Sequence, residues 1–470
     1  MGIRIDYTNM MAERLRAAEG AADARVGIDD AAWARGKEAF AAAYAGFERR
    51  QAAGELGFVA LADGSTLAAE IRQFADGAGQ AFSDIVVLGI GGSALGTIAL
   101  RSALRPPHWN ALSDEERDFY PRLHVLENVD PVTIAALLDR LELGRTLFLV
   151  ISKSGGTAET MAQYLIVRGR LESALGDGVS RHLVFITDPE KGALRAIARK
   201  EGIAALDVPP NVGGRFSVLS AVGLLPAALV GVEIEKLLAG ARDMLARCRS
   251  AALEENPAGV FATLQWLADT TLGLHTQVLM PYSDPLRELS AWWVQLWAES
   301  LGKIRPDGGH VGPTPLPALG ATDQHSQVQL FMEGPRDKTV TFVALAESPV
   351  DLEIPRLHGD LAELAYLGGH SLAELLNAER QATAAALAQR GRANMTITID
   401  RLDAEHLGGL LMLLEVATVY AGELYGVNPL DQPGVELGKR YTYALMGRPD
   451  AAEARREWES IPRPERLRTV

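Results

Sequence analysis

The distribution of apolar residues changes once along the chain, near residue 84. Residues 8–80 are dominated by helix-favouring stretches such as Ala31–Arg50, in which alanines are interspersed with Glu, Lys and Arg. Beyond Asp84, short β-branched apolar runs alternate with amphipathic stretches that are long enough for helices. This alternation predicts parallel sheets with helices on both faces.

The apolar runs form two sets. The first set predicts strands at Asp84–Leu88, Leu123–Glu127, Thr146–Ile151, Leu183–Thr187 and Ile203–Val208. The second, looser set predicts strands at His275–Met280, Gln327–Met332, Val340–Ala346 and Met395–Ile399. We therefore predict the α/β class, with two α/β/α sandwich domains of mainly parallel sheets plus N- and C-terminal helical segments. The predicted bounds are 1–82 (helical), 83–232 (first domain), 233–272 (connecting helices), 273–447 (second domain) and 448–470 (tail).

Composition narrows the classes of partner. Hydrophobic residues make up 48% of the 470 positions, which is ample for two cores. The net charge of −14 argues against a nucleic-acid partner, because phosphate backbones are bound by Lys- and Arg-rich surfaces. An anionic ligand must therefore be held by local donors.

Cysteine content and apolar runs indicate a cytoplasmic protein without a membrane partner. Cys248 is the single cysteine, so the fold does not depend on disulfides. The N-terminal stretch MGIRIDYTNMMAERL contains no apolar signal core. The most apolar stretch, Phe216–Val232, contains Pro226 and lies at the lower limit of spanning length, so we predict a buried core helix there.

The segment after the strand at 146–151 has the features of a phosphate site. Ser152, Ser154 and Thr157 offer hydroxyl donors, and Gly155 and Gly156 allow the backbone to approach an anion. The predicted helix beyond them offers free N–H groups and a partial positive charge. Capping the helix would need only one hydroxyl. The presence of three hydroxyls therefore favours phosphate binding over a strand–turn–helix connection without a ligand.

A second glycine loop, Gly89–Ser93, follows the strand at 84–88. It resembles a dinucleotide fingerprint, but the GxGGSxxG spacing differs from GxGxxG. A second sugar-binding loop, with Gly92 and Ser93 lining the pocket, is therefore favoured over a Rossmann site.

Further polar residues carry little information when each is taken alone. Ser283-Asp284-Pro285 opens a predicted helix to Gly302, on which Gln295 and Glu299 share a face near tryptophans. By itself Glu299 would be taken as a solvated glutamate. The others are Arg215 after two glycines, His325 in a polar loop and Lys439 in a helix that follows Gln432.

Together these segments resemble glucose-6-phosphate isomerases of the shorter bacterial type. The segments GIGGSALG, SKSGGTAET, GGRFS, AESLGK, DQHSQ and DQPGVELGK occur in the family's order between about Asp84 and Lys439. The resemblance implies two sugar-isomerase (SIS-like) domains, of which the first binds phosphate and the second carries the base, histidine and lysine. It also implies a homodimer with shared active sites and a reaction of glycolysis and gluconeogenesis.

The resemblance also implies residue roles. Ser152, Lys153, Ser154 and Thr157 would hold the phosphate, Lys153 through its backbone N–H, and Gln295 and Gln432 would bind the phosphate end or hydroxyls. Glu299 would transfer the proton between C2 and C1, and Arg215 would stabilise the enediolate. His325, donated by the partner subunit, would open the sugar ring with help from Lys439. No cofactor or metal is expected, since the chain has no HxxxH, CxxC or carboxylate-cluster motif.

These residue types suit an intramolecular oxidoreductase that interconverts an aldose and a ketose. One carboxylate can move a proton between adjacent carbons, and an arginine offers a permanent positive charge to the enediolate. Two departures concern substrate preference: Leu430 stands where the family commonly has an aromatic residue, and Ser154-Gly155-Gly156 replaces a bulkier Thr-Phe-Thr. A sugar-phosphate-binding regulator is disfavoured by the catalytic set, whereas side activity on mannose 6-phosphate stays open.

Overall fold

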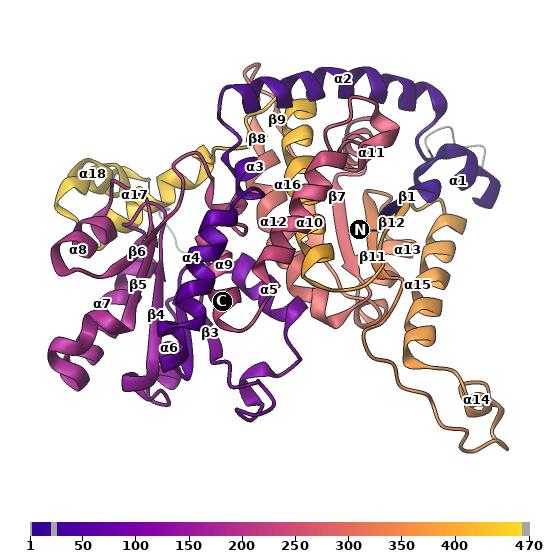
Figure 1. The fold of residues 1–470 in the computed structure, drawn as a ribbon. Helices are drawn as coiled ribbons and strands as arrows, with labels where there is room; N and C mark the ends of the chain where they lie inside the picture. Colours follow the sequence, from indigo (N-terminus) through magenta and orange to yellow (C-terminus); the bar gives the residue numbers. More distant parts are fainter. Residues whose placement is uncertain (1, 20–25, 463–470) are drawn as a thin grey trace. The chain divides into compact units, whose positions relative to one another are not determined.

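The computed structural model describes residues 2–19 and 26–462, and Figure 1 shows their fold. The chain divides into two compact units, Met1–Pro429 and Leu430–Val470, and each is described by itself. Both sheets and most of the helices belong to the first unit.

The first sheet confirms all five strands that were predicted for it, to within one residue at each end. Its strands are all parallel in the order β3-β2-β4-β5-β6. Their bounds are β2 Asp84–Leu88, β3 Arg122–Leu126, β4 Thr146–Ile151, β5 Leu183–Thr187 and β6 Ala204–Asp207. Every residue of β2, β4 and β5 is buried, as expected for continuous apolar strands between two helical layers.

The second sheet has the order β1-β12-β11-β7-β10, with only β1 antiparallel. Its strands are β1 Ile3–Asp6, β7 Thr276–Pro281, β10 Thr314–Pro317, β11 Lys338–Leu345 and β12 Asn394–Ile399. The predictions for β7, β11 and β12 are confirmed. A separate two-stranded ribbon joins β8 Lys303–Ile304 to β9 His310–Val311.

The strand predicted at Gln327–Met332 is wrong, because this segment forms helix α13, Val328–Glu333. Phe331 is buried, and Val328 and Met332 pack beside it in the same core. Their spacing of three and four residues belongs to one face of a helix. Strand β10 was not predicted, and it contains two prolines, which are unusual within strands. They are tolerated since β10 lies at the sheet edge.

The helices pack around these sheets, and their bounds are given in chain order. In the first unit they are α1 Ala12–Glu19, α2 Asp30–Ala52, α3 Gly57–Leu61, α4 Ser65–Asp76, α5 Leu95–Leu104, α6 Pro131–Leu138, α7 Ala158–Leu175, α8 Ala193–Glu201, α9 Ala221–Leu229, α10 Ile234–Arg247, α11 Pro257–Leu272, α12 Arg287–Leu301, α13, α14 Ala362–Ala365, α15 Leu372–Gln389 and α16 Ala404–Tyr425.

Helices α9, α5 and α12 connect the two sheets through their packing. Helix α9 contacts β2, α5 packs against both α9 and α12, and α12 contacts β7 and β10. Figure 1 shows these helices between the two sheets. Helix α9 is buried along its whole length, which confirms the core helix predicted within Phe216–Val232.

Helix α16 is the central helix of the first unit, packed against α2, α10, α11 and α12. It is long and apolar enough to cross a membrane by length and composition, but 89% of its apolar window is buried inside the protein. Its Glu415 is fully buried, and neither carboxylate oxygen has a hydrogen-bond partner among the described residues. Burial therefore raises the pKa of Glu415 well above its usual range.

The second unit contains α17 Glu436–Leu445 and α18 Ala452–Ser460, which pack on each other through Tyr441 and Trp458. The segment predicted as a C-terminal tail, 448–470, is thus helical over 452–460, and its last eight positions lie outside the described residues. The remaining predicted domain bounds stay a prediction.

Candidate active site

Both loops predicted to bind the sugar phosphate follow central strands of the first sheet. The chain leaves β2 toward β3 on one side, and it leaves β4 toward β5 on the other. The loops that follow β2 and β4 therefore diverge and open a crevice at the carboxyl ends of the strands, where α/β sheets bind ligands. Gly89–Ser93 follows β2 and Ser152–Thr157 follows β4.

The three hydroxyls of the second loop lie together. The Ser152 hydroxyl is 2.8 Å from that of Thr157, and the Ser154 hydroxyl is 3.4 Å from each. Gly155 adopts φ +63°, which few residues other than glycine tolerate. Helix α7 begins immediately after Thr157, so the free N–H groups of its first turn lie at the end of the helix nearest this loop. The arrangement provides a compact set of donors for an anion.

The Lys153 side chain is directed elsewhere. Its ammonium group donates to the carbonyl of Pro210 at 2.8 Å, and burial lowers its pKa. Any contribution of Lys153 to an anion in the loop would therefore come from its backbone N–H, the role that the family resemblance implies.

The glycine loop after β2 packs closely on the segment that carries Arg215. A methyl group added to Gly92 would lie 2.2 Å from the carbonyl oxygen of Gly214, so a larger residue there requires the loops to separate. The Ser217 hydroxyl donates to the Gly92 carbonyl at 3.3 Å. A methyl group on Gly91 would lie 2.9 Å from the Gln295 amide nitrogen. The loop thus lies between the Arg215 segment and helix α12, with Ser93 in its short 3-10 turn.

Arg215 is buried and is held in three directions. Its Nε donates to the Ser300 hydroxyl at 2.7 Å, Nη1 pairs with Glu299 Oε2 at 3.2 Å, and Nη2 donates to the Pro429 carbonyl. The Phe216 ring lies below the guanidinium, 5.6 Å from its centroid. These contacts fix the orientation of a permanent positive charge beside Glu299.

Glu299 has a partner on each carboxylate oxygen. Oε2 faces Arg215, and Oε1 accepts from Gln295 Nε2 at 3.1 Å, one helical turn earlier on α12. The side chain is 34% exposed, so it is accessible to a ligand. The tryptophans of this helix lie in the core instead, where Trp297 donates to Gln277. Its polar partners, rather than an aromatic pocket, define the surroundings of Glu299.

His325 lies at the end of a short turn, Thr322–His325, with its side chain exposed. The Asp323 carboxylate holds this turn by accepting from the Leu319 N–H and the Ser326 hydroxyl. The His325 ring forms no hydrogen bond or ion pair with another residue in the described part of the chain, and so none with Glu299 or Arg215. The structure therefore does not join His325 to the Arg215–Glu299 pair within this chain.

Gln432 and Lys439 belong to the second unit. Gln432 precedes the turn Pro433–Val435, and Lys439 lies on α17, where its ammonium group pairs with Glu436 at 2.9 Å. Their participation in the site stays a prediction. Across residues 2–19 and 26–462, no three His, Cys, Asp or Glu side chains cluster as metal ligands.

Sequence reasoning missed the groups that orient Arg215. Ser300 directly follows Glu299, and its position beside that residue could have suggested a role. The Pro429 carbonyl gives no sequence signal, because any residue supplies a backbone oxygen.

Comparisons with known proteins identify one family. The family model described as phosphoglucose isomerase matches residues 65–461. The glucose-6-phosphate isomerase of Rubrobacter xylanophilus is 53% identical over 78% of this chain and 83% of its own length. That of Carboxydothermus hydrogenoformans is 44% identical over 97% of each chain. A solved glucose-6-phosphate isomerase of Chlamydia trachomatis has a TM-score of 0.72 at 26% identity, covering 84% of this chain and 77% of that one.

Proposed function

Because the chain belongs to the phosphoglucose isomerase family, we propose that Arg215 and Glu299 form the catalytic centre of its isomerase activity. The enzyme is a glucose-6-phosphate isomerase and interconverts glucose 6-phosphate and fructose 6-phosphate. The observation that carries the proposal is the Arg215–Glu299 contact of 3.2 Å beside the glycine loop Gly89–Ser93. A coupled assay with fructose 6-phosphate on the purified protein tests the activity, with mannose 6-phosphate measured alongside.

The contacts support different roles for Glu299 and Arg215 during proton transfer. A carboxylate oxygen has two lone pairs, so Glu299 retains the capacity to accept a proton while it is held by Arg215 and Gln295. It would take the proton from C2 and return it to C1. The guanidinium of Arg215, oriented by Ser300 and Pro429, would stabilise the negative charge of the enediolate.

We propose that the hydroxyl loop anchors the 6-phosphate. Ser152, Ser154 and Thr157 present their donors at the start of α7, and Gly92 and Ser93 line the sugar. Gln295 and Gln432 would complete the binding of the substrate's polar groups.

Replacing Ser154 and Thr157 together by alanine should raise KM more than it lowers kcat. Phosphate contacts bind the ground state and the transition state nearly equally, so their loss weakens binding uniformly. Initial rates over a range of fructose 6-phosphate concentrations measure both constants, and Ser173→Ala, on the distant half of α7, serves as the control. An unchanged KM would contradict the phosphate assignment.

We also propose that the enzyme is a homodimer in which His325 is donated to the partner's site. The exposed His325 ring does not bond to Glu299 of its own chain. In addition, residues 350–372 expose seven large apolar side chains: Val350, Leu352, Leu357, Leu361, Leu364, Tyr366 and Leu372. Figure 1 shows this segment, with α14, extending beyond α15. Such an apolar surface is typical of an interface. Lys439 would assist His325 in opening the sugar ring.

Mixing two inactive variants tests the shared site. His325→Ala and Glu299→Gln should each be nearly inactive, and subunit exchange between them should restore about one quarter of the parental activity. This follows because half of the randomly formed dimers are mixed, and each mixed dimer has one intact site. If both residues act within one chain, the mixture stays inactive. Exchange is verified independently by the masses of the mixed dimers.

We further propose a cytoplasmic location, in line with the single, buried Cys248 and the burial of the apolar helix α16. Fractionation of cells that produce the protein would test this.

A further inference from the structure

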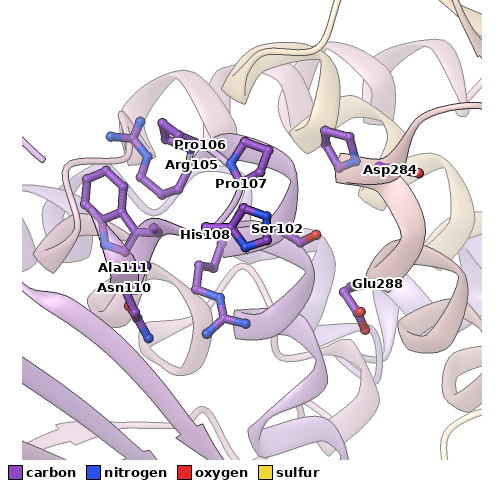
Figure 2. Close-up of a pocket in the computed structure, with 12 residues that line it drawn as sticks. Ser102, Arg105, Pro106, Pro107, His108, Asn110, Ala111, Asp284 and Glu288 are labelled. Carbon is purple, nitrogen blue, oxygen red and sulfur yellow. The ribbon is translucent and has the colours of Figure 1, made fainter. Parts of the chain in front are cut away.

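A cavity of about 550 Å³ lies between the end of α5 and the beginning of α12. Figure 2 shows its two walls: residues from Ser102 to Ala111 on one side, and Asp284 and Glu288 on the other. Its volume falls in the range of roughly 300–1,000 Å³ that is usual for small-molecule sites.

This cavity is separate from the catalytic centre. Helix α5 begins beyond the glycine loop and ends at the cavity, whereas α12 begins at the cavity and ends just beyond Glu299. Glu288 and Glu299 are therefore about 16 Å apart along the axis of α12. One sugar-sized ligand cannot occupy both places.

Arg101 and Arg105 line the cavity without a carboxylate partner. Arg101 donates to the Leu123 carbonyl at 2.9 Å, and Arg105 donates to the Leu104 carbonyl and stacks over Trp109. Within the described ranges neither guanidinium forms an ion pair. Burial lowers the pKa of both groups, so the cost of desolvating their charges is only partly offset.

Other partly or fully buried arginines of this acidic protein do have such partners. Arg50 pairs with Glu423 at 2.5 Å, Arg72 with Glu235 at 3.0 Å, and Arg215 with Glu299 at 3.2 Å. Proximity to the glutamates raises the pKa of Arg50 and Arg72 against the opposing effect of burial. Arg101 and Arg105 differ from these three arginines, as does Arg380, whose pKa is also lowered by burial and which donates to Asn377 and Thr396.

The partial negative charge at the C-terminal end of α5 is too small to neutralise both Arg101 and Arg105. A helix C-terminus carries a partial charge of roughly −0.5, which favours one nearby cation but does not neutralise two. The carboxylates on the opposite wall lie at the beginning of α12, where acidic residues are favoured for the same reason. Neither Asp284 nor Glu288 forms an ion pair in the described part of the chain.

We propose that this cavity binds a small hydroxylated anion of the size of a sugar phosphate. The anionic group lies against Arg101 and Arg105, with the exposed His108 beside them, and the hydroxyl groups donate to Asp284 and Glu288. Carboxylates such as Glu288 and Glu127 attract Arg101 from a distance but form no ion pair with it, so a bound anion would give the arginines a direct partner.

The number of glucitol 6-phosphate molecules bound per chain tests the proposal. Glucitol 6-phosphate carries a phosphate and hydroxyls but cannot be isomerised, and equilibrium dialysis counts the bound molecules. We expect the double variant Arg101→Gln/Arg105→Gln to bind one molecule fewer per chain than the parent. Arg249→Gln, an exposed arginine outside the cavity, makes the same chemical change and should bind as many as the parent.

A second variant keeps the test valid if removal of two half-buried arginines impairs folding. Ala111→Phe narrows the cavity from its exposed rim without changing any charge, and it should also lose one molecule. Isomerase activity, which depends on the other site, verifies that each variant is folded. If folded Ala111→Phe or the double arginine variant binds as many molecules as the parent, the proposal is wrong. The difference between variant and parent in the number of bound molecules per chain tests the proposal even if the catalytic crevice binds no glucitol 6-phosphate.

Discussion

Glu299→Gln should lower kcat about 100-fold or more, because the amide has no basic oxygen with which to remove the substrate proton. Glutamine has nearly the same shape, and its amide oxygen can accept from either Gln295 or Arg215. The loops that we propose to hold the sugar phosphate are not altered, so substrate affinity should change little. This combination of lost turnover and retained binding is the mark of a group that acts in the chemical step.

The measurement combines initial rates with the direct binding of fructose 6-phosphate to the variant. Solvent exchange gives a second readout. A functional base exchanges the C2 proton of glucose 6-phosphate with deuterium from the solvent. Both turnover and exchange should fall together. Glu333→Gln, an exposed glutamate on α13, makes the same chemical change outside the site and should leave kcat unchanged. Near-normal turnover of Glu299→Gln would show that another group is the base.

Arg215→Lys should lower kcat on the order of 10²–10³-fold, the range found when one donor to a developing oxyanion is lost. Lysine keeps the charge but lacks the planar set of donors that reaches Ser300, Glu299 and the Pro429 carbonyl together. The charge would therefore no longer be fixed where the enediolate forms. Groups left unpaired should also lower the free energy of unfolding by about 1–3 kcal/mol.

Arg72→Lys separates the catalytic effect from the structural one. Arg72 is also partly buried and is paired with a glutamate, Glu235, but it does not contact the site residues. Its lysine variant should show a comparable fall in Tm with an unchanged kcat. If the two lysine variants lose turnover equally, the loss reflects stability, and Arg215 has no special role at the enediolate.

The sequence by itself determined the first sheet and the ligand loops. Strands such as Thr146–Ile151 are continuous apolar runs bounded by polar or glycine-rich loops, and a strand buried on both faces requires that pattern whatever surrounds it. The hydroxyls and glycines of Ser152–Thr157 also lie within one short loop. Their proximity follows from the chain itself and needs no tertiary contact.

Packing determined the secondary structure of segments whose sequence pattern did not determine it alone. Residues 327–332 are apolar enough for a strand, yet the core accepts Val328, Phe331 and Met332 from one helical face. Strand β10 forms in spite of its prolines, because an edge position leaves one side of the strand without a sheet partner. Such outcomes depend on neighbouring elements that a local pattern does not contain.

The Arg215–Glu299 contact is a product of the tertiary structure. Arg215 and Glu299 are 84 positions apart and were linked at the sequence level only by resemblance to a family. The fold brings them together because the Arg215 turn packs on both the glycine loop and α12, and Pro429 and Ser300 then orient the guanidinium. A short stretch of sequence shows which residues can carry a charge. Which charged side chains come into contact depends on how distant segments pack.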